Sequence, residues 1–380
     1  MSDRRRLLDG LRPCLAVFVA ARIGLSVLSM VAIGPVDPLP PVDVPGGSAP
    51  PATPGWHNSV DATVRQDAVW YLRLSDRGWS QNDASAAFFP LYPLTVRVVD
   101  AVVPGSTVIA ALLVSNLAFL GALVALFALT AEAFGERTAR RAIVVAAIFP
   151  TAFFFLAPYT ESLFLLLSVL AFREARHDRW GRVAVFGGLA ALTRSVGIVL
   201  VPALALDAVR REDGVRAGVV RLAGAASIAL GPLLWFLWWG LVHRNALAPL
   251  DAQGNWGRVV QPPWVSLWHA VELAWTYGSY WLLDLLVVGL AVAGLALAMP
   301  ALRRSEAAYG ILSLALPLFD PYWDRPLLSA PRFAVVVFPA LWGLSGVGLG
   351  RRLPPLLVAA VLAAGYAVCV VLFVNWLHLF

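Results

Sequence analysis

Asp67 is the acidic residue whose neighbours are most suggestive of chemistry. Read as a helix, residues 65–74 bring Asp67, Trp70 and Tyr71 onto one face. A carboxylate on such an apolar stripe can take a proton from a substrate hydroxyl as a general base. It can also cap the helix or form an ion pair with Arg65 or Arg73. The residue pattern alone leaves both interpretations open.

Two arginines interrupt or open apolar segments. Arg194 lies between two half-length apolar runs, and Arg332 follows Pro331 at the start of another. A guanidinium inside a bilayer costs at least about 2.5–3.5 kcal/mol, so it needs a partner or a wet cavity. Its planar set of donors suits a phosphate group. Snorkelling to the headgroups or anchoring at the interface explains the same positions.

Glu161 and several tryptophans are weaker candidates. Glu161 follows Thr160 at the start of an apolar run, so a helix-start acid and a site residue are both compatible with its position. Trp70 and Trp256 lie beside polar residues and can stack on a sugar or grip a lipid headgroup. Most of the 15 tryptophans fit an interfacial aromatic belt instead.

These residue types suit the transfer of a sugar from a lipid phosphate. The leaving group is already a good anion, so the reaction needs a carboxylate base and cations that hold the phosphate. An Asp side chain with a reference pKa of about 3.9 is ionised at neutral pH. The sequence has no glycine-rich nucleotide turn and no P-loop. Its five histidines lack metal-ligand spacing, so no cofactor is expected and a divalent metal is not indicated.

The elements that must position these residues are membrane helices. Of the 380 residues, 59% are hydrophobic and 14% are charged, with a mean hydropathy of +0.75. This composition predicts an all-α polytopic membrane protein. All 29 basic residues are arginine, and they lie mainly in short connectors between apolar runs. That distribution indicates cytoplasmic connectors rather than a nucleic-acid binder.

Hydropathy and the arginine distribution together predict about eleven membrane spans. The N-terminus is expected in the cytoplasm of a plasma-membrane protein, with the active site facing outside. The predicted spans cover residues 11–33, 106–134, 142–158, 160–173, 183–193, 196–209, 219–242, 281–300, 306–319, 332–350 and 354–378. Four of them are shorter than the roughly 20 residues of a full crossing, which is typical of broken helices that line a cavity.

The hydrophilic segments are expected to gather on the outer side. Residues 34–105 form a long first outer loop with amphipathic juxtamembrane helices, and residues 243–280 form a second outer loop. No outer segment is long enough for an independent soluble domain. Residues 1–380 are therefore expected to form a single integral-membrane domain, with the chemistry at the border between these loops and the bilayer.

Several sequence blocks, spread in order over most of the chain, carry a family resemblance. They are Arg65-Gln66-Asp67 through Arg73, residues 87–94, 149–154, 157–162 and 191–194, Trp256-Gly257-Arg258, residues 262–264, Pro331-Arg332-Phe333 and residues 338–339. Through these blocks the chain resembles the PIG-V family of mannosyltransferases, particularly its bacterial relatives.

The resemblance implies a glycosyltransferase of the GT-C architecture. Its donor would be a polyprenyl-phosphate sugar, usually mannose, and its acceptor an extracytoplasmic glycolipid or glycan. Asp67 matches the acid of the first outer loop that is expected to act as the base. The residues expected to bind the donor phosphate or the substrates are Arg194, Arg332, Arg65, Tyr159, Glu161, Trp70, Trp256 and Arg258.

The chain departs from the family pattern at two positions. Relatives tend to carry an aromatic residue before the acid, where this chain has Gln66, and often a proline after the arginine, where it has Ser195. Both departures leave room for a different donor or acceptor.

Two other functions fit parts of the sequence. A lipid or glycan transporter without covalent chemistry would suit the short spans and the buried arginine. It would also predict polar groups on both faces of the pathway and often repeated halves. A purely structural subunit would not explain Asp67 or Arg194. The sequence therefore favours the enzyme.

Overall fold

Helices form nearly all of the regular structure. The computed structural model describes residues 3–33, 44–45, 47–50, 55–81, 83–208, 214–254, 257–348 and 354–377. Within these ranges the extended segments pair only as isolated β-bridges, Val44 with Gly47 and Arg258 with Tyr322. The prediction of an all-α chain is confirmed.

The chain divides into two packed units. Unit 1 comprises Met1–Trp79, Tyr92–Leu163 and Gly350–Phe380, and unit 2 comprises Ser80–Leu91 and Phe164–Leu349. A single integral-membrane domain over residues 1–380 stays a prediction.

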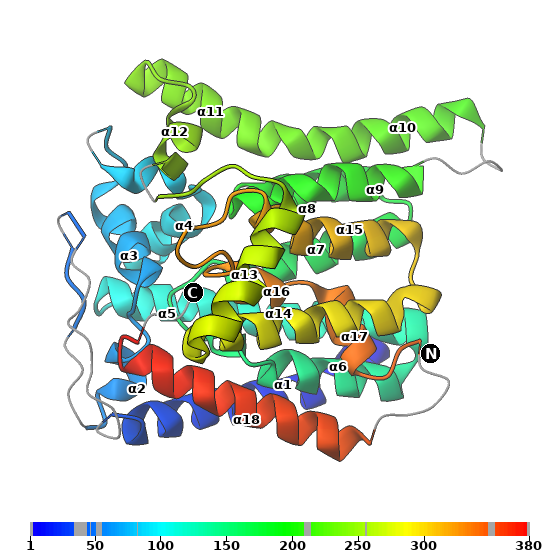
Figure 1. Cartoon of the computed structure of the whole chain (residues 1–380). Coiled ribbons are helices and arrows are strands. Elements are labelled where there is room, and N and C mark those ends of the chain that lie inside the picture. The colour runs from blue at the N-terminus through cyan, green and yellow to red at the C-terminus, as the bar shows by residue number, and fades with distance from the viewer. Residues whose placement is uncertain are drawn as a thin grey trace. The chain divides into compact units, whose positions relative to one another are not determined.

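Unit 1 is built on long helices that come from both ends of the chain. Its elements are α1 (Asp3–Val31), α2 (Asn58–Asp61), α3 (Asp67–Arg77), α4 (Leu91–Asp100), α5 (Thr107–Phe134), α6 (Glu136–Ile148), η2 (Ala152–Phe155), the start of α7 (Glu161–Arg176) and α18 (Pro355–Val374). Helix α1 packs on α5, and α18 runs beside α1 and α6 (Figure 1). Gly135, with φ +85°, ends α5 and lets the chain reverse into α6.

Unit 2 contains most of the shorter helices. Its elements are η1 (Ala84–Ala87), the rest of α7, α8 (Trp180–Ala191), η3 (Ser195–Val199), α9 (Leu200–Ala208), α10 (Val215–Ala226), η4 (Ser227–Ala229), α11 (Leu230–His243), α12 (Ala248–Gly254), α13 (Pro263–Tyr277), α14 (Ser279–Ala298), η5 (Met299–Ala301), α15 (Arg304–Ala315), η6 (Leu316–Leu318), α16 (Ala330–Ala334) and α17 (Phe338–Leu344).

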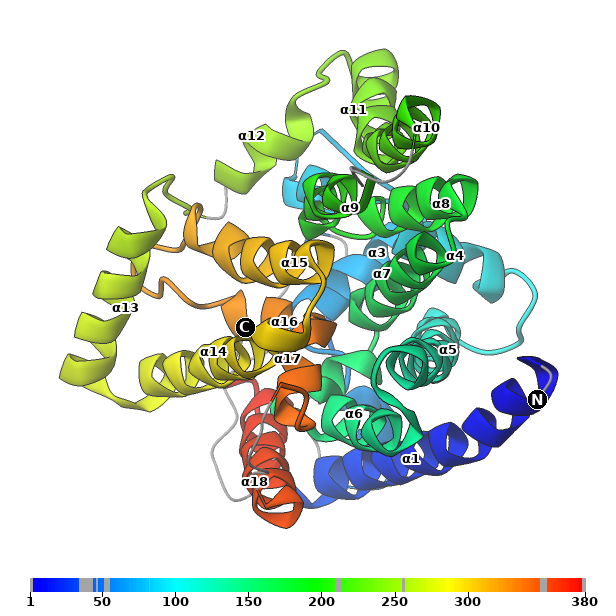
Figure 2. The same cartoon turned by 90° about the vertical axis from the view of Figure 1, so that its right-hand side faces the viewer.

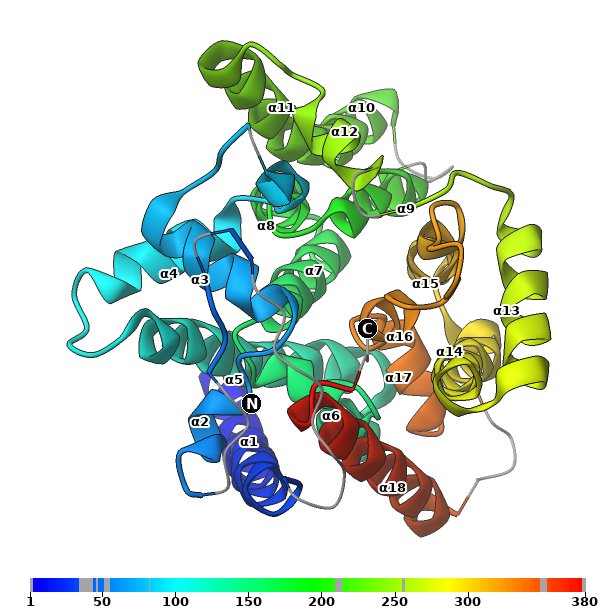
Figure 3. The same ribbon diagram turned by 60° about the vertical axis from the view of Figure 1, so that its left-hand side comes forward.

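Small residues allow very close packing in unit 2. Helices α14 and α17 cross where Gly294 meets Ala340 and Gly343, and a Cβ added at Gly343 would overlap the carbonyl oxygen of Gly294. Such small-residue contacts are typical of helix pairs in membranes. Helix α9 packs on both α10 and α15 (Figure 2), and α13 packs against α14 at a steep angle (Figure 3).

Five described helices are long and apolar enough to cross a membrane. They are Gly10–Val31, Thr107–Phe134, Val215–His243, Ser279–Ala301 and Pro355–Val374. The chain is thus a multi-pass membrane protein, but the count of eleven spans is not confirmed. Each remaining predicted span coincides with one or two short helices. Residues 142–158, for example, break into α6 and η2 at Phe149 and Pro150.

The two segments predicted as outer loops carry short helices. Residues 34–105 contain α2, α3, η1 and α4, and residues 243–280 contain α12 and α13. The expected helices are therefore present, and the side of the membrane on which they lie stays a prediction.

Candidate functional site

A strained turn fixes the start of α3. Gln66 has φ +50° and ψ −125°, and the amide of Ala68 donates to the carbonyl of Arg65 at 3.0 Å. These values match a type II′ turn, whose second position normally holds glycine. A non-glycine residue there costs of the order of 1–3 kcal/mol, so the surroundings must hold it. The predicted helix over residues 65–74 begins later than expected, at Asp67.

Arg65 holds this turn from inside unit 1. Its side chain is completely buried, and Nε donates to the carbonyl of Val374 at 3.1 Å. Nη1 donates to the carbonyls of Asp61 at 2.8 Å, Val64 at 3.0 Å and Pro50 at 3.3 Å. Burial lowers the pKa of Arg65 to about 10, which still leaves the group charged at neutral pH.

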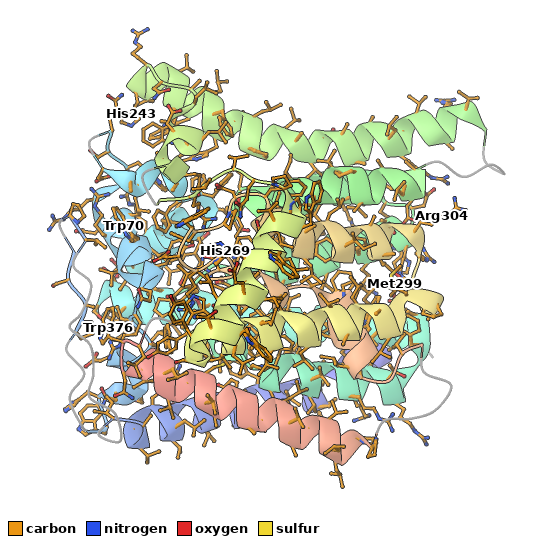
Figure 4. The ribbon with its side chains drawn as sticks, in the orientation of Figure 1. Trp70, His243, His269, Met299, Arg304 and Trp376 are labelled. Carbon is orange, nitrogen blue, oxygen red and sulfur yellow. The ribbon has the colours of Figure 1, made fainter. Side chains whose placement is uncertain are left out.

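Two aromatic residues from distant parts of the chain complete the enclosure of Arg65. The guanidinium lies 4.8 Å from the ring centre of Trp376, just after α18, and Tyr159 donates its hydroxyl to the carbonyl of Arg65 at 2.7 Å. Figure 4 labels Trp376 and, on α3, Trp70. Arg65 was predicted to bind substrate. Its burial and its backbone partners instead suit a residue that positions the turn before Asp67.

Tyrosines pack behind the turn. The ring of Tyr71 lies 5.3 Å from that of Tyr92 and 6.0 Å from that of Tyr159, both edge-on. The hydroxyls of Tyr92 and Ser115 are 2.8 Å apart, and Ser115 donates to the carbonyl of Tyr159 at 3.2 Å. This hydrogen-bonded layer links α3, α4 and α5 beneath the first turn of α3.

Asp67 and Glu161 each begin a helix but differ in exposure. Asp67 is the first residue of α3 and is partly exposed, whereas Glu161 is the first residue of α7 and is fully buried. The positive end of a helix dipole favours a negative charge at both positions. Only Asp67 combines that position with access from outside the protein, which a base acting on an incoming hydroxyl requires.

Of the two tryptophans predicted to stack on a sugar, Trp70 lies within the described residues. Trp70 is 6% exposed, and the guanidinium of Arg73 lies 5.7 Å from its ring centre. This burial leaves little ring surface for a sugar. Trp256 lies outside the described residues.

The two predicted phosphate-binding arginines both lie in unit 2, and both are nearly buried. Arg194 is 5% exposed and has an extended backbone immediately before η3, and its guanidinium is 4.6 Å from the ring centre of Phe333. Arg332, the residue before Phe333, is 9% exposed in α16. The structure therefore brings Arg194 against Phe333, the residue that follows Arg332 in the sequence.

Arg258 connects two loops of unit 2, the one that precedes α13 and the one between η6 and α16. Its Nη1 donates to the carbonyl of Asp320 at 3.0 Å, and its guanidinium lies 4.9 Å from the ring centre of Tyr322. Burial raises the pKa of the Asp320 carboxyl above its usual value, and Arg258 opposes that rise. These contacts make Arg258 a link between loops, whereas its predicted contact with substrate stays a prediction.

Several contacts around the site were missed by sequence reasoning. Arg22, inside α1, donates to the carbonyls of Ser59 at 2.9 Å and Leu156 at 3.3 Å. An arginine inside an apolar run was the signal that singled out Arg194, and it would have found Arg22 as well. No local pattern marks Ser115 or Trp376, because their partners are distant in sequence.

Among the described residues, no group of three or more His, Cys, Asp or Glu side chains could hold a metal ion. The expectation that no metal takes part stays a prediction.

The predicted site residues thus fall into two sets. Unit 1 contains Arg65, Asp67, Trp70, Tyr159 and Glu161, and unit 2 contains Arg194, Arg258 and Arg332. The first set is a partly exposed acid on a rigid hydrogen-bonded turn. The second contains two nearly buried arginines, of which Arg194 lies against the ring of Phe333, and Arg258, which links two loops.

A family model described as Mannosyltransferase (PIG-V) matches residues 48–211. The matched range includes Asp67, Tyr159, Glu161 and Arg194, so the predicted resemblance is confirmed over that part of the chain. None of the curated proteins matches the sequence.

The chain is also similar to solved structures at low sequence identity. ArnT from Cupriavidus metallidurans bound to undecaprenyl phosphate is 15% identical, with a TM-score of 0.49 over 96% of this chain and 76% of that chain. The Archaeoglobus fulgidus oligosaccharyltransferase, in complex with zinc and sulfate, is 13% identical, with a TM-score of 0.44 over 95% of this chain. This chain covers 53% of the oligosaccharyltransferase, about half of its length.

Proposed function

Starting from the match of residues 48–211 to the PIG-V mannosyltransferases, we propose that this chain transfers a mannosyl unit from a polyprenyl-phosphate sugar to a glycolipid or glycan outside the cytoplasm. The reaction inverts the configuration at the anomeric carbon of the sugar. Asp67 is the general base, and Arg194 and Arg332 bind the phosphate of the donor.

The proposed step needs one base and no acid. The acceptor hydroxyl oxygen attacks C1 of the sugar while its proton passes to the Asp67 carboxylate. The bond between C1 and the phosphate oxygen breaks, and its electron pair leaves with the polyprenyl phosphate. Because this leaving group is a stable anion, cations that stabilise its growing charge replace a proton donor.

The observation that carries the proposal is the fixed turn before Asp67. The backbone accepts strain at Gln66, and Arg65 and Tyr159 provide hydrogen bonds that hold the turn in place. Strained backbone that is retained by its surroundings is characteristic of active sites. A general base must be held within hydrogen-bond reach of the proton that it removes, and a rigid turn at a helix start satisfies that demand.

The role proposed for Arg194 and Arg332 follows from their chemistry. Each is nearly buried, so its charge interacts strongly with an anion because little water screens it. A planar guanidinium can form paired hydrogen bonds to phosphate oxygens. We further propose that the N-terminus is cytoplasmic and that the transfer takes place outside the plasma membrane, as the arginine distribution indicates.

The test is a transfer assay with the purified full-length protein in detergent. It uses labelled polyprenyl-phosphomannose and membranes from cells that lack this gene, because those membranes contain the unmodified acceptor. The proposal predicts a mannosylated product and an equal amount of free polyprenyl phosphate, with the product of opposite anomeric configuration to the donor.

The alternative of a transporter gives a different result in the same system. A transporter reconstituted into vesicles would move the intact donor across the bilayer without releasing polyprenyl phosphate. Movement without release would contradict the enzyme and favour the transporter.

A further inference from the structure

An acidic residue lies inside an apolar helix of unit 2. Asp284 belongs to the candidate membrane span Ser279–Ala301, which begins with α14, and it is 1% exposed. A carboxylate at such a place is costly unless it is paired. Its partner is Arg325, which is 7% exposed and lies in the segment between η6 and α16. The transfer step proposed above uses neither residue.

The ion pair of Asp284 and Arg325 is bidentate. Arg325 donates from Nε to Oδ2 at 2.6 Å and from Nη2 to Oδ1 at 2.9 Å. Two such hydrogen bonds between planar groups fix their orientation as well as their separation. Trp281 of the same helix donates its indole N–H to the carbonyl of Asp324 at 2.9 Å, and the guanidinium of Arg325 lies 5.5 Å from the ring centre of Tyr280. The start of α14 therefore holds residues 324 and 325 firmly.

Stability of the fold does not by itself account for this pair. Both groups give up their hydration on burial, and replacing a buried ion pair by well-packed apolar residues is often neutral or stabilising. Apolar side chains at positions 284 and 325 would also suit a membrane span. The pair supplies what apolar packing lacks, which is a defined direction of contact.

The segment that Arg325 begins leads directly into α16. The N–H of Leu328 donates to the carbonyl of Arg325 at 2.9 Å, and the N–H of Arg332 donates to the carbonyl of Ser329 at 3.2 Å. These consecutive turns connect the ion pair to Arg332 through hydrogen-bonded backbone.

The face of α14 that carries Asp284 also covers this segment. Val288, one helical turn after Asp284, packs with Leu327 and Ala330 in a buried apolar cluster. Helix α16 itself packs against α14 and α15 (Figure 2). The entry to α16 is thus held by a charged contact and by an apolar contact from one helix face.

The position of α16 decides where Arg332 lies. This helix has five residues, and so short a helix depends on contacts with its surroundings. After the helix, Tyr309 donates its hydroxyl to the carbonyl of Val336 at 3.1 Å. The segment around Arg332 is therefore fixed on both sides, and the Asp284–Arg325 pair is the charged contact at its entry.

We propose that Asp284 and Arg325 are positioning residues for the phosphate of the donor. The pair fixes the entry to α16 and thereby the place of the Arg332 guanidinium. Asp284 and Arg325 act through Arg332 and need no contact with the substrate. The inference rests on the proposed function, in which Arg332 binds the polyprenyl phosphate.

Equilibrium binding of undecaprenyl phosphate to the purified full-length protein tests this role. The paired variant Asp284→Leu/Arg325→Met removes both charges at once, so no buried charge is left uncompensated and the unfolding temperature should stay near that of the parent protein. The dissociation constant should nevertheless rise by about tenfold or more, because a displaced Arg332 loses a charge-assisted contact. Asp284→Asn changes the shape least, and its dissociation constant should rise as well.

A double-mutant cycle shows whether the pair acts through Arg332. In Arg332→Gln the phosphate contact is already lost, so adding Asp284→Leu/Arg325→Met should raise the dissociation constant by less than about twofold. A further tenfold rise in that background would overturn the inference, because the pair would then act independently of Arg332.

A second buried ion pair of unit 2 is the matched control. Glu306 is 1% exposed, it accepts from Nε of Arg176 at 3.1 Å, and its other oxygen accepts from the N–H of Arg303 at 2.9 Å. This pair joins α7 to α15 and lies outside the segment that enters α16. Glu306→Gln/Arg176→Met should leave the affinity for undecaprenyl phosphate unchanged. An equal loss of affinity in this control would show a general disturbance of unit 2 and would contradict the inference.

Mannosyl transfer by the parent protein is measured in parallel, so that the two proposals fail differently. Binding of undecaprenyl phosphate without transfer would contradict the proposed function and leave the role of the pair intact. Transfer by the parent protein, with unchanged binding in both Asp284 variants, would contradict only the role of the pair. Absence of binding to the parent protein would overturn the inference itself.

Discussion

Arg65 in unit 1 and Arg194 in unit 2 are both nearly or completely buried guanidinium groups, yet their surroundings differ. Arg65 donates to four backbone carbonyls and lies against Trp376. Arg194 precedes η3 with an extended backbone and lies against Phe333, next to Arg332. One arginine donates to the chain's own backbone carbonyls, and the other lies against Phe333, the sequence neighbour of Arg332.

The difference separates two uses of a buried charge. Backbone carbonyls that satisfy a guanidinium make it part of the fold, because removing it leaves several buried acceptors unsatisfied. A nearly buried cation is weakly screened by water, so it interacts strongly with an anionic ligand. We therefore propose a positioning role for Arg65 and phosphate binding for Arg194, although the sequence suggested the same role for both.

The largest expected effect concerns activity and belongs to Arg194. Arg194→Met keeps the apolar contact with Phe333 but removes the charge, and we expect transfer to slow by about 100-fold or more. Arg194→Lys restores the charge but not the planar guanidinium group, so it should recover only part of the transfer rate. Steady-state kinetics with polyprenyl-phosphomannose measures both. Wild-type rates in Arg194→Met would remove this residue from the phosphate site.

The largest effect on stability is expected for Arg65. Arg65→Met leaves four carbonyls without their donor, so we expect a loss of at least about 2 kcal/mol in the free energy of unfolding. Thermal unfolding in detergent measures it, with Arg194→Met as the matched comparison. If Arg194→Met were the more destabilising of the two, the assignment of roles would be reversed.

A smaller loss is expected for Tyr159. Tyr159→Phe removes the hydroxyl that donates to Arg65 and keeps the ring contacts with Tyr71, so about 0.5–1.5 kcal/mol should be lost. Tyr366→Phe is the control, because the buried hydroxyl of Tyr366 has no hydrogen-bond partner among the described residues. Equal unfolding temperatures for the two variants would contradict the role of Tyr159 in holding the turn.

The smallest effect tests the strain at Gln66. Gln66→Gly suits a φ of +50° and should stabilise the protein by roughly 0.5–1 kcal/mol, because it releases strain but adds chain entropy in the unfolded state. Gln66→Val places a β-branched residue in the same conformation and should destabilise it. Chemical denaturation of both variants gives the sign of each change. A stabilising valine would show that the turn is not strained.

Local pattern was enough to predict most of the elements. The apolar runs located the helices, and the spacing of Asp67, Trp70 and Tyr71 predicted α3. The count of eleven spans was not confirmed, because a hydropathy window does not show that Phe149 and Pro150 divide residues 142–158 into short pieces.

The environment of the candidate site was less predictable, because it depends on partners far apart in sequence. Arg65 precedes a helix in the sequence, and only the fold brings Val374 and Trp376 to it. The left-handed turn at Gln66 was also hidden, since glutamine does not mark such a turn as glycine would. Residue type predicted Asp67 and Arg194, whereas packing determines what each of them can do.

The most direct test of the central claim compares two carboxylates of α3. Asp67 begins the helix, and Asp76 lies at its far end with a side chain that is 69% exposed. The measurement is the single-turnover rate of mannosyl transfer in Asp67→Asn and Asp76→Asn, with equal unfolding temperatures as the folding control. Because Asp67→Asn loses the general base, its transfer rate should fall by at least about 100-fold, while Asp76→Asn should transfer at a rate near that of the wild type. Transfer by Asp67→Asn at the wild-type rate would contradict the account.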